Sequence, residues 1–459
     1  MVEHALQRLR DGLKDTPYAD KMYLVGGYVR DKLLGRPLPS DVDLVLEGNA
    51  LELAQFLYEH GIAEHRPVTY PRFGTAMVHV AGAPIELVTA RSESYHNQSR
   101  KPNEVRPATL YEDALRRDFT VNTLLENLHT GEILDPLGTG IADLEAKVLR
   151  TPRDPHETFY EDPLRMLRAV RFAAQLGFTI DPSVYQAILE QAERLAIVSI
   201  ERIQAEFTRL MDSPQAHLGL GMLLDTRLLH QFGQPLLPMI GCTQNEYHLY
   251  DVWEHSLKAV AFVNPDGLEI PAWELRLAAL LHDVGKPNTR TVDEHGKVHF
   301  YEHDRVGADI AMKWLRDLRY AHSVIERVVK LVSLHMRPGA YTPEWSDSAI
   351  RRLIRDAGEL LEPLLRLVQA DIQAQRQDIP HADLNALRER VLRVQAKQPQ
   401  EQWRSPLTGK QIMERFGLKP GPLVGQIKRY LEEQVLEGNL APEDVEGAWR
   451  MAEAFLRGA

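Results

Sequence analysis

Short hydrophobic runs separated by polar turns fill the first third of the chain, and they predict a small sheet. Four runs rich in Val, Ile and Leu are predicted strands, at residues 22–27, 41–48, 75–80 and 85–90. Residues 50–61 instead carry hydrophobic positions at helical spacing, and Gly61 ends that pattern. This stretch is therefore expected to fold as a small α+β domain.

Helical periodicity dominates the chain from about Asp143 to its end, broken where proline and glycine gather. Two of these clusters, at residues 230–241 and 396–409, are predicted linkers. The predicted organisation is an α+β head with a small mixed sheet, followed by an all-helical neck, a second helical module and a helical tail. Their predicted bounds are 1–142, 143–235, 236–400 and 401–459.

Composition narrows the class of protein. The 459 residues are too many for one ordinary core, and 44% hydrophobic with 26% charged residues is a globular balance. No apolar run approaches the ~18 residues that a membrane helix needs, and the N-terminal stretch lacks the apolar core of a signal peptide. The only cysteine, Cys242, fits a reducing cytoplasm. We therefore expect a cytoplasmic protein of two to four domains without membrane contact.

Two glycines, Gly26 and Gly27, end the first predicted strand, and a helix is predicted to follow. Glycines adopt backbone angles that other residues resist, and they let a phosphate approach main-chain N–H groups. The helix N-terminus together with Arg30 could therefore hold a triphosphate.

Asp41 and Asp43 are separated by one residue on a predicted strand, so both carboxylates face the same side. Such hard oxygen ligands suit magnesium, which uses few protein carboxylates together with substrate phosphates. Two ions could then hold the attacking hydroxyl and the leaving pyrophosphate. Glu86, in the middle of another predicted strand, is a candidate third carboxylate, although an outward-facing strand residue is an equally good interpretation of Glu86 alone.

Each of these features alone is ordinary, because a Gly-Gly pair is usually just a turn and an Asp-x-Asp pair usually faces solvent. Together they form an ordered set: a strand, a Gly-Gly turn, a helix with Arg and Asp, and a second strand with Asp-x-Asp. This set resembles the nucleotidyltransferase superfamily that includes DNA polymerase β. The chain has no GxxxxGK[ST] loop and no complete GxGxxG, so P-loop ATPase and Rossmann interpretations lack their motif.

Further motifs narrow the resemblance. The ordered set "LVGGYVRD", "DVD", "RRDFTVN", "DPLG" and "EDPLRMLRAVRFAAQLGF" resembles the class II tRNA nucleotidyltransferases, the CCA-adding enzymes and their bacterial poly(A) polymerase relatives. The resemblance covers about residues 20–210. It implies a polymerase-β-like head with a two-metal site and a neck helix that selects the nucleotide. One departure is Asn122-Thr123, where the family often has Asn-Ala, and we expect no loss of activity from it.

The resemblance also implies roles for residues of this chain. Asp41 and Asp43 would bind magnesium. The residues that hold the nucleotide would be Gly26, Gly27, Arg30 and Arg117, and those that select it would be Asp162, Arg165, Arg168 and Arg171. A carboxylate accepts from an exocyclic amino group while a guanidinium donates to ring nitrogens and carbonyls, so an Asp–Arg pair can prefer C and A without a template. The tRNA 3′ hydroxyl would attack the α-phosphate, and pyrophosphate would leave. On an isolated helix, an ordinary surface i,i+3 pair would be the favoured interpretation of Asp162 and Arg165.

The helical second half contains a second motif set, ordered H…HD…H…H…D, which resembles the HD phosphohydrolase superfamily. By this resemblance His255, His282, Asp283 and Asp371 would hold one metal, and His303 and His335 could add a second. Imidazole and carboxylate mixtures suit Mn, Ni, Co or Fe, with Mg also possible. In tRNA nucleotidyltransferases with this domain, the implied activity is hydrolysis of 2′,3′-cyclic phosphates and 2′-phosphates.

The last segment, 405–448, resembles the helical C-terminal domain of the same enzymes, and the tail is expected to contact tRNA. Lys419 there could meet a phosphate, although a solvated lysine is the simpler interpretation. Gly421 and Gly425 could allow close approach of RNA or be turn positions.

The net charge of −11 is unusual for an RNA enzyme. We expect a local basic face from "RRDF", "RMLRAVRF" and "IRRLIRD", with salt-sensitive binding.

The sequence therefore predicts a CCA-adding enzyme that uses CTP, ATP and magnesium, with a metal-dependent hydrolase in the HD domain. Enzymes that add only CC or only A share nearly all these motifs; the stretch 90–118 is not shortened, which disfavours a CC-only enzyme. A poly(A) polymerase often has a basic tail, which this chain lacks. A protein uridylyltransferase would lack "EDPLR", and a hydrolase with a relic head conflicts with the intact Asp41 and Asp43. The oligomeric state stays open.

Overall fold

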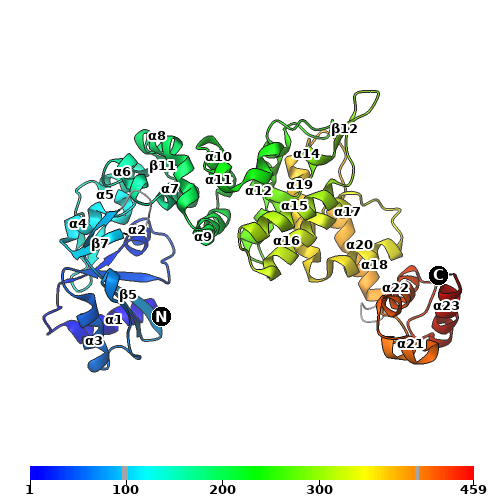
Figure 1. Cartoon of the computed structure of the whole chain (residues 1–459), viewed down its shortest axis with the longest axis horizontal. Coiled ribbons are helices and arrows are strands. Elements are labelled where there is room, and N and C mark those ends of the chain that lie inside the picture. Colours follow the sequence, from blue (N-terminus) through cyan, green and yellow to red (C-terminus); the bar gives the residue numbers. More distant parts are fainter. Residues whose placement is uncertain (96–101, 398–402, 459) are drawn as a thin grey trace. The chain divides into compact units, whose positions relative to one another are not determined.

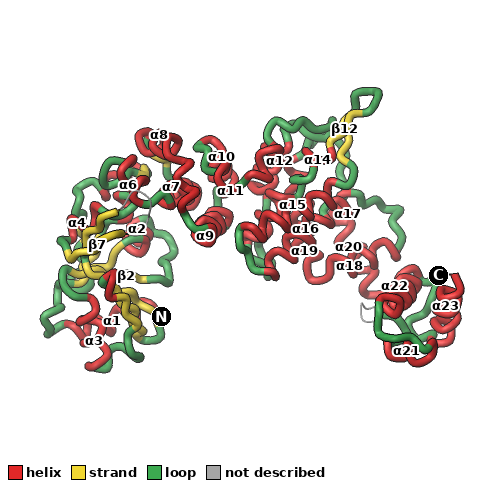
Figure 2. The backbone as a smooth tube through the Cα atoms, in the orientation of Figure 1, coloured by secondary structure: helices red, strands yellow, loops and turns green. Residues whose placement is uncertain are grey.

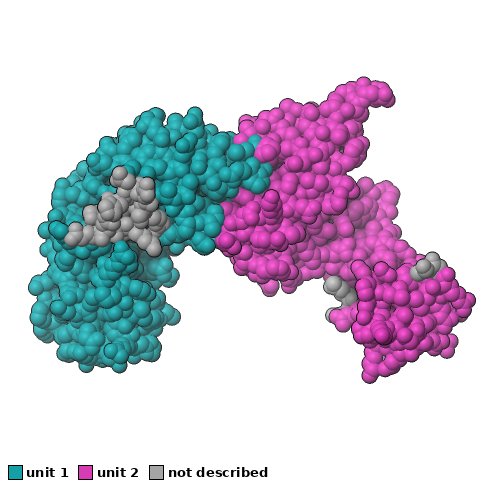
Figure 3. Space-filling view, in the orientation of Figure 1, with its two compact units in different colours: residues 1–237 teal, residues 238–459 magenta. Residues whose placement is uncertain are grey.

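The computed structural model describes residues 1–95, 102–397 and 403–458. It divides into two compact units, residues 1–237 and 238–459 (Figure 3). The border falls inside the predicted linker at 230–241. The predicted linker at 396–409 contains residues 398–402, which lie outside the described residues. The predicted borders at 142 and 400 stay predictions, and helix α5 (Gly140–Ala146) runs across the first of them.

A mixed sheet forms the core of the first part of unit 1 (Figure 2). Within the described residues its strand order is β3-β4-β5-β2-β1-β8-β9, and β2 and β5 form its parallel pair. The strands are β1 (Met22–Val25), β2 (Val42–Leu46), β3 (Val68–Tyr70), β4 (Thr75–Val80), β5 (Ala83–Thr89), β8 (Leu125–Asn127) and β9 (Ile133–Leu134). The four predicted strands are confirmed as β1, β2, β4 and β5. The fold class is the expected one, a mixed sheet followed by helices.

Helices cover this sheet through narrow apolar faces. In α1 (Val2–Leu13) and α3 (Ala50–Glu59) the buried residues recur at intervals of three and four, which is the spacing of one helix face. The predicted helix at 50–61 is thus confirmed as α3. Its Asn49 side chain accepts hydrogen bonds from the first backbone N–H groups, and Gly61 follows its end with φ +68°. The other helices here are α2 (Gly27–Leu33), α4 (Leu110–Leu115) and α5.

The second part of unit 1 is helical, and α7 lies at its centre against α9 and α10 (Figure 1). Leu164, Leu167 and Val170 form a buried apolar stripe on α7. A two-residue parallel pair, β10 (Val148–Leu149) with β11 (Thr179–Ile180), joins the helices. The helices are α6 (Pro155–Glu161), α7 (Leu164–Leu176), α8 (Pro182–Gln191), α9 (Ile200–Met211), α10 (Ala216–Asp225) and α11 (Leu229–Phe232).

Unit 2 is helical apart from one hairpin of β12 (Arg290–Val292) and β13 (Val298–Phe300) among its described residues. Its helices are α12 (Val252–Phe262), α13 (Ala272–Leu281), α14 (Lys286–Thr289), α15 (His303–Asp317), α16 (His322–Leu334), α17 (Met336–Gly339), α18 (Asp347–Ala357), α19 (Leu361–Ala374), α20 (Leu384–Lys397), α21 (Gly409–Phe416), α22 (Pro422–Glu437) and α23 (Val445–Gly458). The hairpin was not expected in a region of helical periodicity. Among the described helices, none has both the length and the apolar composition needed to cross a membrane.

The last three helices have a hydrophobic core of their own, built around Ile412, Ile427 and Leu431. They are joined to α18 by arginines of the "IRRLIRD" segment. Arg352 and Arg355 form ion pairs with glutamates of α22, and Arg351 donates to a backbone carbonyl there. These arginines therefore hold the tail, so this helix does not supply the unpaired basic face that its sequence indicated.

Candidate active sites

Three carboxylates lie on or directly beside the paired strands β2 and β5. Asp43 is on β2, exposed Asp41 precedes that strand, and Glu86 of β5 is the register partner of Asp43 in the parallel pair. Directly paired residues project from the same face of a sheet, so Glu86 adjoins Asp43 on the side that carries the Asp-x-Asp pair. The structure therefore brings Glu86 next to the Asp-x-Asp pair, from which the sequence separates it by more than forty residues.

Two of these acids hold protons more tightly than ordinary carboxylates. Burial raises the pKa of Asp43, the Arg117 charge opposes that shift, and Asp41 adds to it. Burial and the neighbouring Asp43 likewise raise the pKa of Glu86. Like charges gathered in a partly buried place favour protonation unless a cation neutralises them. Hard carboxylate oxygens crowded in this way fit magnesium.

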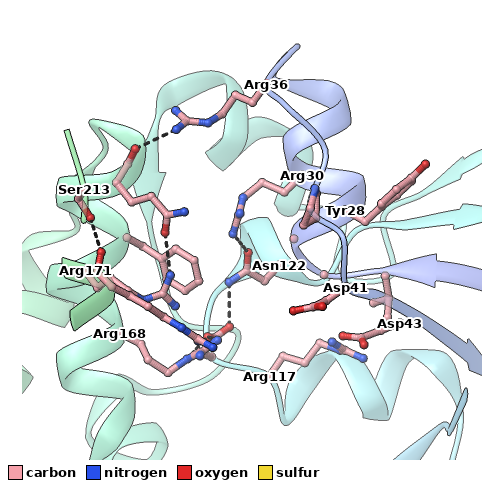
Figure 4. A pocket seen from close by; sticks show the side chains of 18 of the residues that line it. Tyr28, Arg30, Arg36, Asp41, Asp43, Arg117, Asn122, Arg168, Arg171 and Ser213 are labelled. Carbon is pink, nitrogen blue, oxygen red and sulfur yellow. Dashed lines mark hydrogen bonds and ion pairs between the residues drawn. The ribbon is translucent and has the colours of Figure 1, made fainter. Parts of the chain in front are cut away.

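A cleft of about 620 Å³ opens beside the Asp-x-Asp pair (Figure 4). Gly26 and Gly27 line it, and Gly26 has a φ of +76°, which a side chain would strain. A Cβ on Gly27 would lie 3.4 Å from the Arg30 guanidinium. The glycines therefore let the backbone and Arg30 share one wall of the cleft.

A hydrogen-bonded chain links Arg30 to the neck helix. Arg30 donates to the Asn122 side chain at 2.8 Å, and Asn122 donates to Asp118 at 3.0 Å. The other oxygen of Asp118 accepts from Arg168 at 2.6 and 2.8 Å. Burial alone would raise the pKa of Asp118, but the Arg168 charge and the Asn122 hydrogen bond hold it well below its usual range. The network therefore fixes Arg168 against the segment that carries the "RRDF" motif.

Three guanidinium groups surround one phenyl ring in this cleft. The guanidinium carbons of Arg30, Arg168 and Arg171 lie 5.0, 5.3 and 3.8 Å from the Phe172 ring centroid. Arg171 is further paired with buried Glu206 at 2.7 Å. Cation–π contacts of this kind help to hold the three charged groups in place.

The expected selecting residues divide between two hollows. Arg168 and Arg171 line the large cleft, whereas Asp162 and Arg165 line a smaller hollow of about 240 Å³ that shares Arg117, Asp118 and Arg168 with it. Asp162 accepts from the Leu164 backbone N–H, and Arg165 donates to backbone carbonyls. Arg117 is paired with Asp113 at 3.0 Å. The two hollows thus adjoin through their shared residues, and Asp162 and Arg165 also have structural partners.

Several residues of this site carried no role in the sequence interpretation. Asp118 and Asn122 stood in the quoted motif without an assigned contact, and Phe172 stood in the neck motif. Glu206 and Arg36 gave no signal, because Glu206 comes from a helix 35 residues away and Arg36 reaches the Gln175 carbonyl. Such partners are chosen by tertiary packing, which local spacing does not reveal.

The second site lies inside unit 2, where helix ends and helix interiors converge. Two groups of side chains present ligand atoms within 4.8 Å of one another: His255 with His282 and Asp371, and Asp283 with His303 and His335. The sequence placed Asp283 with the first group. In the structure its Oδ2 lies 3.2 Å from His282 and its Oδ1 lies 3.3 Å from His303, so the carboxylate faces both groups.

The imidazoles are oriented by backbone carbonyls. Nδ1 of His282, His303 and His335 donates to the carbonyls of Ala279, Phe300 and Val332, at 2.7, 2.8 and 2.6 Å. A carbonyl can only accept, so in the neutral form of each ring Nδ1 carries the proton and Nε2 presents a lone pair to the cluster. The Nε2 atoms of His303 and His335 nevertheless lie 3.3 Å apart. Two facing lone pairs repel unless a cation lies beside both, so the donor set fits a metal.

Charge in this cluster supports the same conclusion. Burial lowers the pKa of His282, but Asp283 and Asp371 outweigh it and raise that pKa to about 10. Burial and the His282 charge lower the pKa of His335 to about 4. Lys286, three residues after Asp283 in the sequence, lies 2.7 Å from it, although the sequence interpretation gave Lys286 no role. The carboxylates of buried Asp283 and of Asp371 thus strongly favour a positive charge in this cluster.

Comparison with protein families gives three matches along the chain. A model described as the Poly A polymerase head domain matches residues 22–150. A model described as the probable RNA and SrmB-binding site of polymerase A matches residues 177–239, and the HD domain model matches residues 247–373. The matches follow the order that the motifs predicted.

Individual proteins resemble the chain over most of its length. An A-adding tRNA nucleotidyltransferase of Deinococcus radiodurans is 36% identical, over 71% of this chain and 75% of its own. A CC-adding tRNA nucleotidyltransferase of Thermus thermophilus is 35% identical, over 94% and 92%. The solved CCA-adding enzyme of Bacillus stearothermophilus, in complex with CTP, is 26% identical with a TM-score of 0.70, over 99% and 98%. The chain therefore belongs to the tRNA nucleotidyltransferase family, the family of CCA-adding enzymes, and carries an HD domain.

Proposed function

We propose that the protein completes tRNA 3′ ends by adding C, C and A from CTP and ATP without a template. The observation that carries this proposal is the cleft of unit 1, which is lined by the glycine turn, by Asp41 and Asp43, and by Arg168 and Arg171 (the arginine wall). Glu86 is paired with Asp43 on the neighbouring strand. In the proposed reaction Gly26, Gly27 and Arg30 bind the triphosphate. The arginine wall faces the base, and Asp162 offers an acceptor for the amino group of C or A. We place the reaction in the cytoplasm, where tRNA and both nucleotides occur.

Asp41, Asp43 and Glu86 would hold magnesium beside the triphosphate. The ions would supply the Lewis acidity that activates the tRNA 3′ hydroxyl and neutralises the leaving pyrophosphate. The protein itself positions the reacting groups. The paired strands fix the acids, and the hydrogen-bonded chain Arg30–Asn122–Asp118–Arg168 fixes Arg30 relative to Arg168 across the cleft. Correct placement of reactants is a large part of such catalysis.

The test uses three tRNA transcripts, ending before CCA, after C and after CC. Incubation with Mg²⁺ and single or paired nucleotides, followed by gels at nucleotide resolution, should show C, C and A added in order, and no product from UTP or GTP. A long run of A from ATP would instead identify a poly(A) polymerase.

A partial-addition enzyme is the second candidate, because two relatives over 30% identical are named A-adding and CC-adding. The stretch 90–118 that disfavours a CC-only enzyme contains residues 96–101, which lie outside the described residues. Its described parts are strands β6 (Arg91–Tyr95) and β7 (Pro102–Pro107) and helix α4. Addition of A only to tRNA ending in CC, or of C and C only, would replace the full CCA proposal.

We propose further that the HD domain hydrolyses 2′,3′-cyclic phosphates and 2′-phosphates. The support is the buried pair of histidine and carboxylate groups, which suits Mn, Ni, Co, Fe or Mg. Such ions would supply water activation and charge neutralisation at the phosphate. The chain orients the ligands through backbone carbonyls, and Lys286 adds a positive charge beside Asp283. Hydrolysis of 2′,3′-cyclic AMP after loading with each metal tests this proposal.

A further inference from the structure

A cavity of about 540 Å³ opens beside the histidine cluster of unit 2. Cluster residues Asp283, His303, His335 and Asp371 line part of it. Another part is lined by the β12–β13 hairpin and the turn after it, from Lys297 to Tyr301. Figure 1 shows this hairpin projecting from the helices of unit 2. The cavity therefore has a metal-binding part and a part built by the hairpin, for which the proposed hydrolysis gives no role.

Two aromatic rings are stacked on the hairpin side of this cavity. Tyr301 and His299 lie with ring centroids 5.3 Å apart and planes within 9° of parallel. His299 is held by Asp293, with Nε2 to Oδ2 at 2.8 Å, whereas Tyr301 is 69% exposed. Packing of the fold leaves most of the Tyr301 side chain exposed, whereas large aromatic side chains are usually more deeply buried. The pair instead offers a flat aromatic surface to whatever enters the cavity.

The backbone ties this aromatic pair to the metal cluster. Phe300, between the two stacked residues in sequence, accepts the Nδ1 hydrogen bond of His303 at 2.8 Å. Tyr301 is only two residues from His303, so their Cα atoms are at most about 7 Å apart. The Phe300 ring also lies 5.3 Å from the Lys286 ammonium group. The rings and the cluster are therefore held at a short, fixed separation within one cavity.

We propose that Tyr301, supported by His299, is a nucleobase-stacking platform of the HD site. A nucleotide would then bind with its phosphate at the metal cluster and its base on the Tyr301 ring. Every base has a π-face, so stacking tolerates any base identity. The ligand class is accordingly a nucleoside 2′,3′-cyclic phosphate or the same group at an RNA 3′ end. This inference rests on the proposed hydrolase function and adds to it how the substrate is recognised.

The test compares a substrate with a base and one without. Full-length protein and its Tyr301→Ala and Tyr301→Phe variants are assayed with 2′,3′-cyclic AMP and with methyl riboside 2′,3′-cyclic phosphate. We expect Tyr301→Ala to lower kcat/KM for 2′,3′-cyclic AMP about tenfold, a usual size for one base stack. The base-free substrate should be unaffected, and Tyr301→Phe, which keeps the ring, should retain activity. An equal loss on both substrates would overturn the platform.

The matched control is His295→Ala. His295 is an aromatic residue of the same hairpin, its side chain is 84% exposed, and it does not line the cavity. This variant should behave as the parent on both substrates. A short RNA ending in a 2′,3′-cyclic phosphate separates the two ligand sources: a larger tyrosine effect on the RNA than on the free nucleotide assigns the platform to RNA ends, and an equal effect assigns it to the terminal nucleotide alone.

Binding measurements separate failure of the platform from failure of the hydrolase function. If the parent protein hydrolyses neither substrate, the proposed hydrolase function fails. Calorimetric titration of the Mn²⁺-loaded protein with AMP and with ribose 5-phosphate still tests the platform. Tyr301→Ala should weaken AMP binding about tenfold and leave ribose 5-phosphate binding unchanged. Unchanged AMP affinity would overturn the inference.

Discussion

The two sites of this protein use carboxylates in opposite settings. In unit 1, exposed Asp41 and half-buried Asp43 lie beside an open cleft lined by arginines. In unit 2, Asp283 and its histidine neighbours are buried, and backbone carbonyls fix most of the imidazoles. The first site leaves space for phosphate oxygens to complete a metal's coordination, while the second supplies nearly all ligands itself. We therefore expect a metal of unit 1 to bind together with the nucleotide, and a metal of unit 2 to be held by the protein alone.

The largest expected effect comes from Asp41→Ala. Two-metal stabilisation of the transition state is worth several kcal/mol, and each 1.36 kcal/mol is tenfold in rate, so nucleotide addition should fall at least about 10³-fold. Hydrolysis of 2′,3′-cyclic AMP should persist. Asp15→Ala, at an exposed acid of the same unit, is the control and should keep both activities. Loss of both activities in Asp41→Ala would contradict two independent sites.

His282→Ala should have the next largest effect, in the histidine cluster of unit 2. Removing a neighbour of a metal ligand costs about 10–100-fold in affinity or activity, so removing a ligand should cost about 100-fold or more. Metal analysis after desalting should find tightly bound transition metal in the parent protein and much less in this variant. Nucleotide addition should be unchanged. His322→Ala, at a histidine whose side chain is 84% exposed, should retain its metal; parent protein that loses all metal on desalting would refute the expectation of a protein-held metal.

Arg168→Lys should have a moderate effect confined to unit 1. Lysine cannot reproduce the paired N–H groups that Arg168 presents to Asp118, so the arginine wall should loosen. We expect KM for CTP and ATP to rise about tenfold, the cost of one good charged hydrogen bond, with increased incorporation of UTP or GTP. Arg66→Lys, at an exposed position outside the cleft, serves as the control. Unchanged KM and selectivity would show that the Arg168–Asp118 pair is structural only.

The smallest effect concerns pH. The pKa of Asp118 is depressed in the folded protein, so its pairing with Arg168 stabilises the fold above the unfolded-state pKa near ~4. That stabilisation is lost as pH falls toward the folded-state value. Calorimetry should therefore find Asp118→Asn to unfold about 3 °C below the parent at pH 7. The difference should shrink as pH falls to 3; a constant difference would contradict this linkage.

Some features of the two sites could be predicted from the sequence, and others could not. The Asp-x-Asp strand and the ordered histidines were visible, because a strand's period of two and the motif order are local properties. The sequence named Glu86 as a candidate third acid on a neighbouring strand, but its direct alignment with Asp43 was not visible, since strand register depends on how β2 and β5 pair. The position of Asp283 between two metal groups likewise requires the fold. These ligand roles remain predictions until variants are measured.

Two further misses have physical causes. The β12–β13 hairpin is three residues per strand, too short for a clear alternation, although "VDEHGKV" carries a turn glycine that could have revealed it. The arginines of α18 suggested an RNA-facing surface, but glutamates some eighty residues later neutralise them. Composition counts charges, whereas only a structure shows which charges are already paired.

The phenyl ring of Phe172 constrains which substitutions the cleft of unit 1 can accept during evolution. Arg30, Arg168 and Arg171 all rest on that one ring. Replacing any of them changes the support of the other two, so substitutions here should be strongly epistatic. A lineage that shifts its nucleotide preference would have to alter these four side chains together, which makes a change of specificity rarer than a change of any one residue.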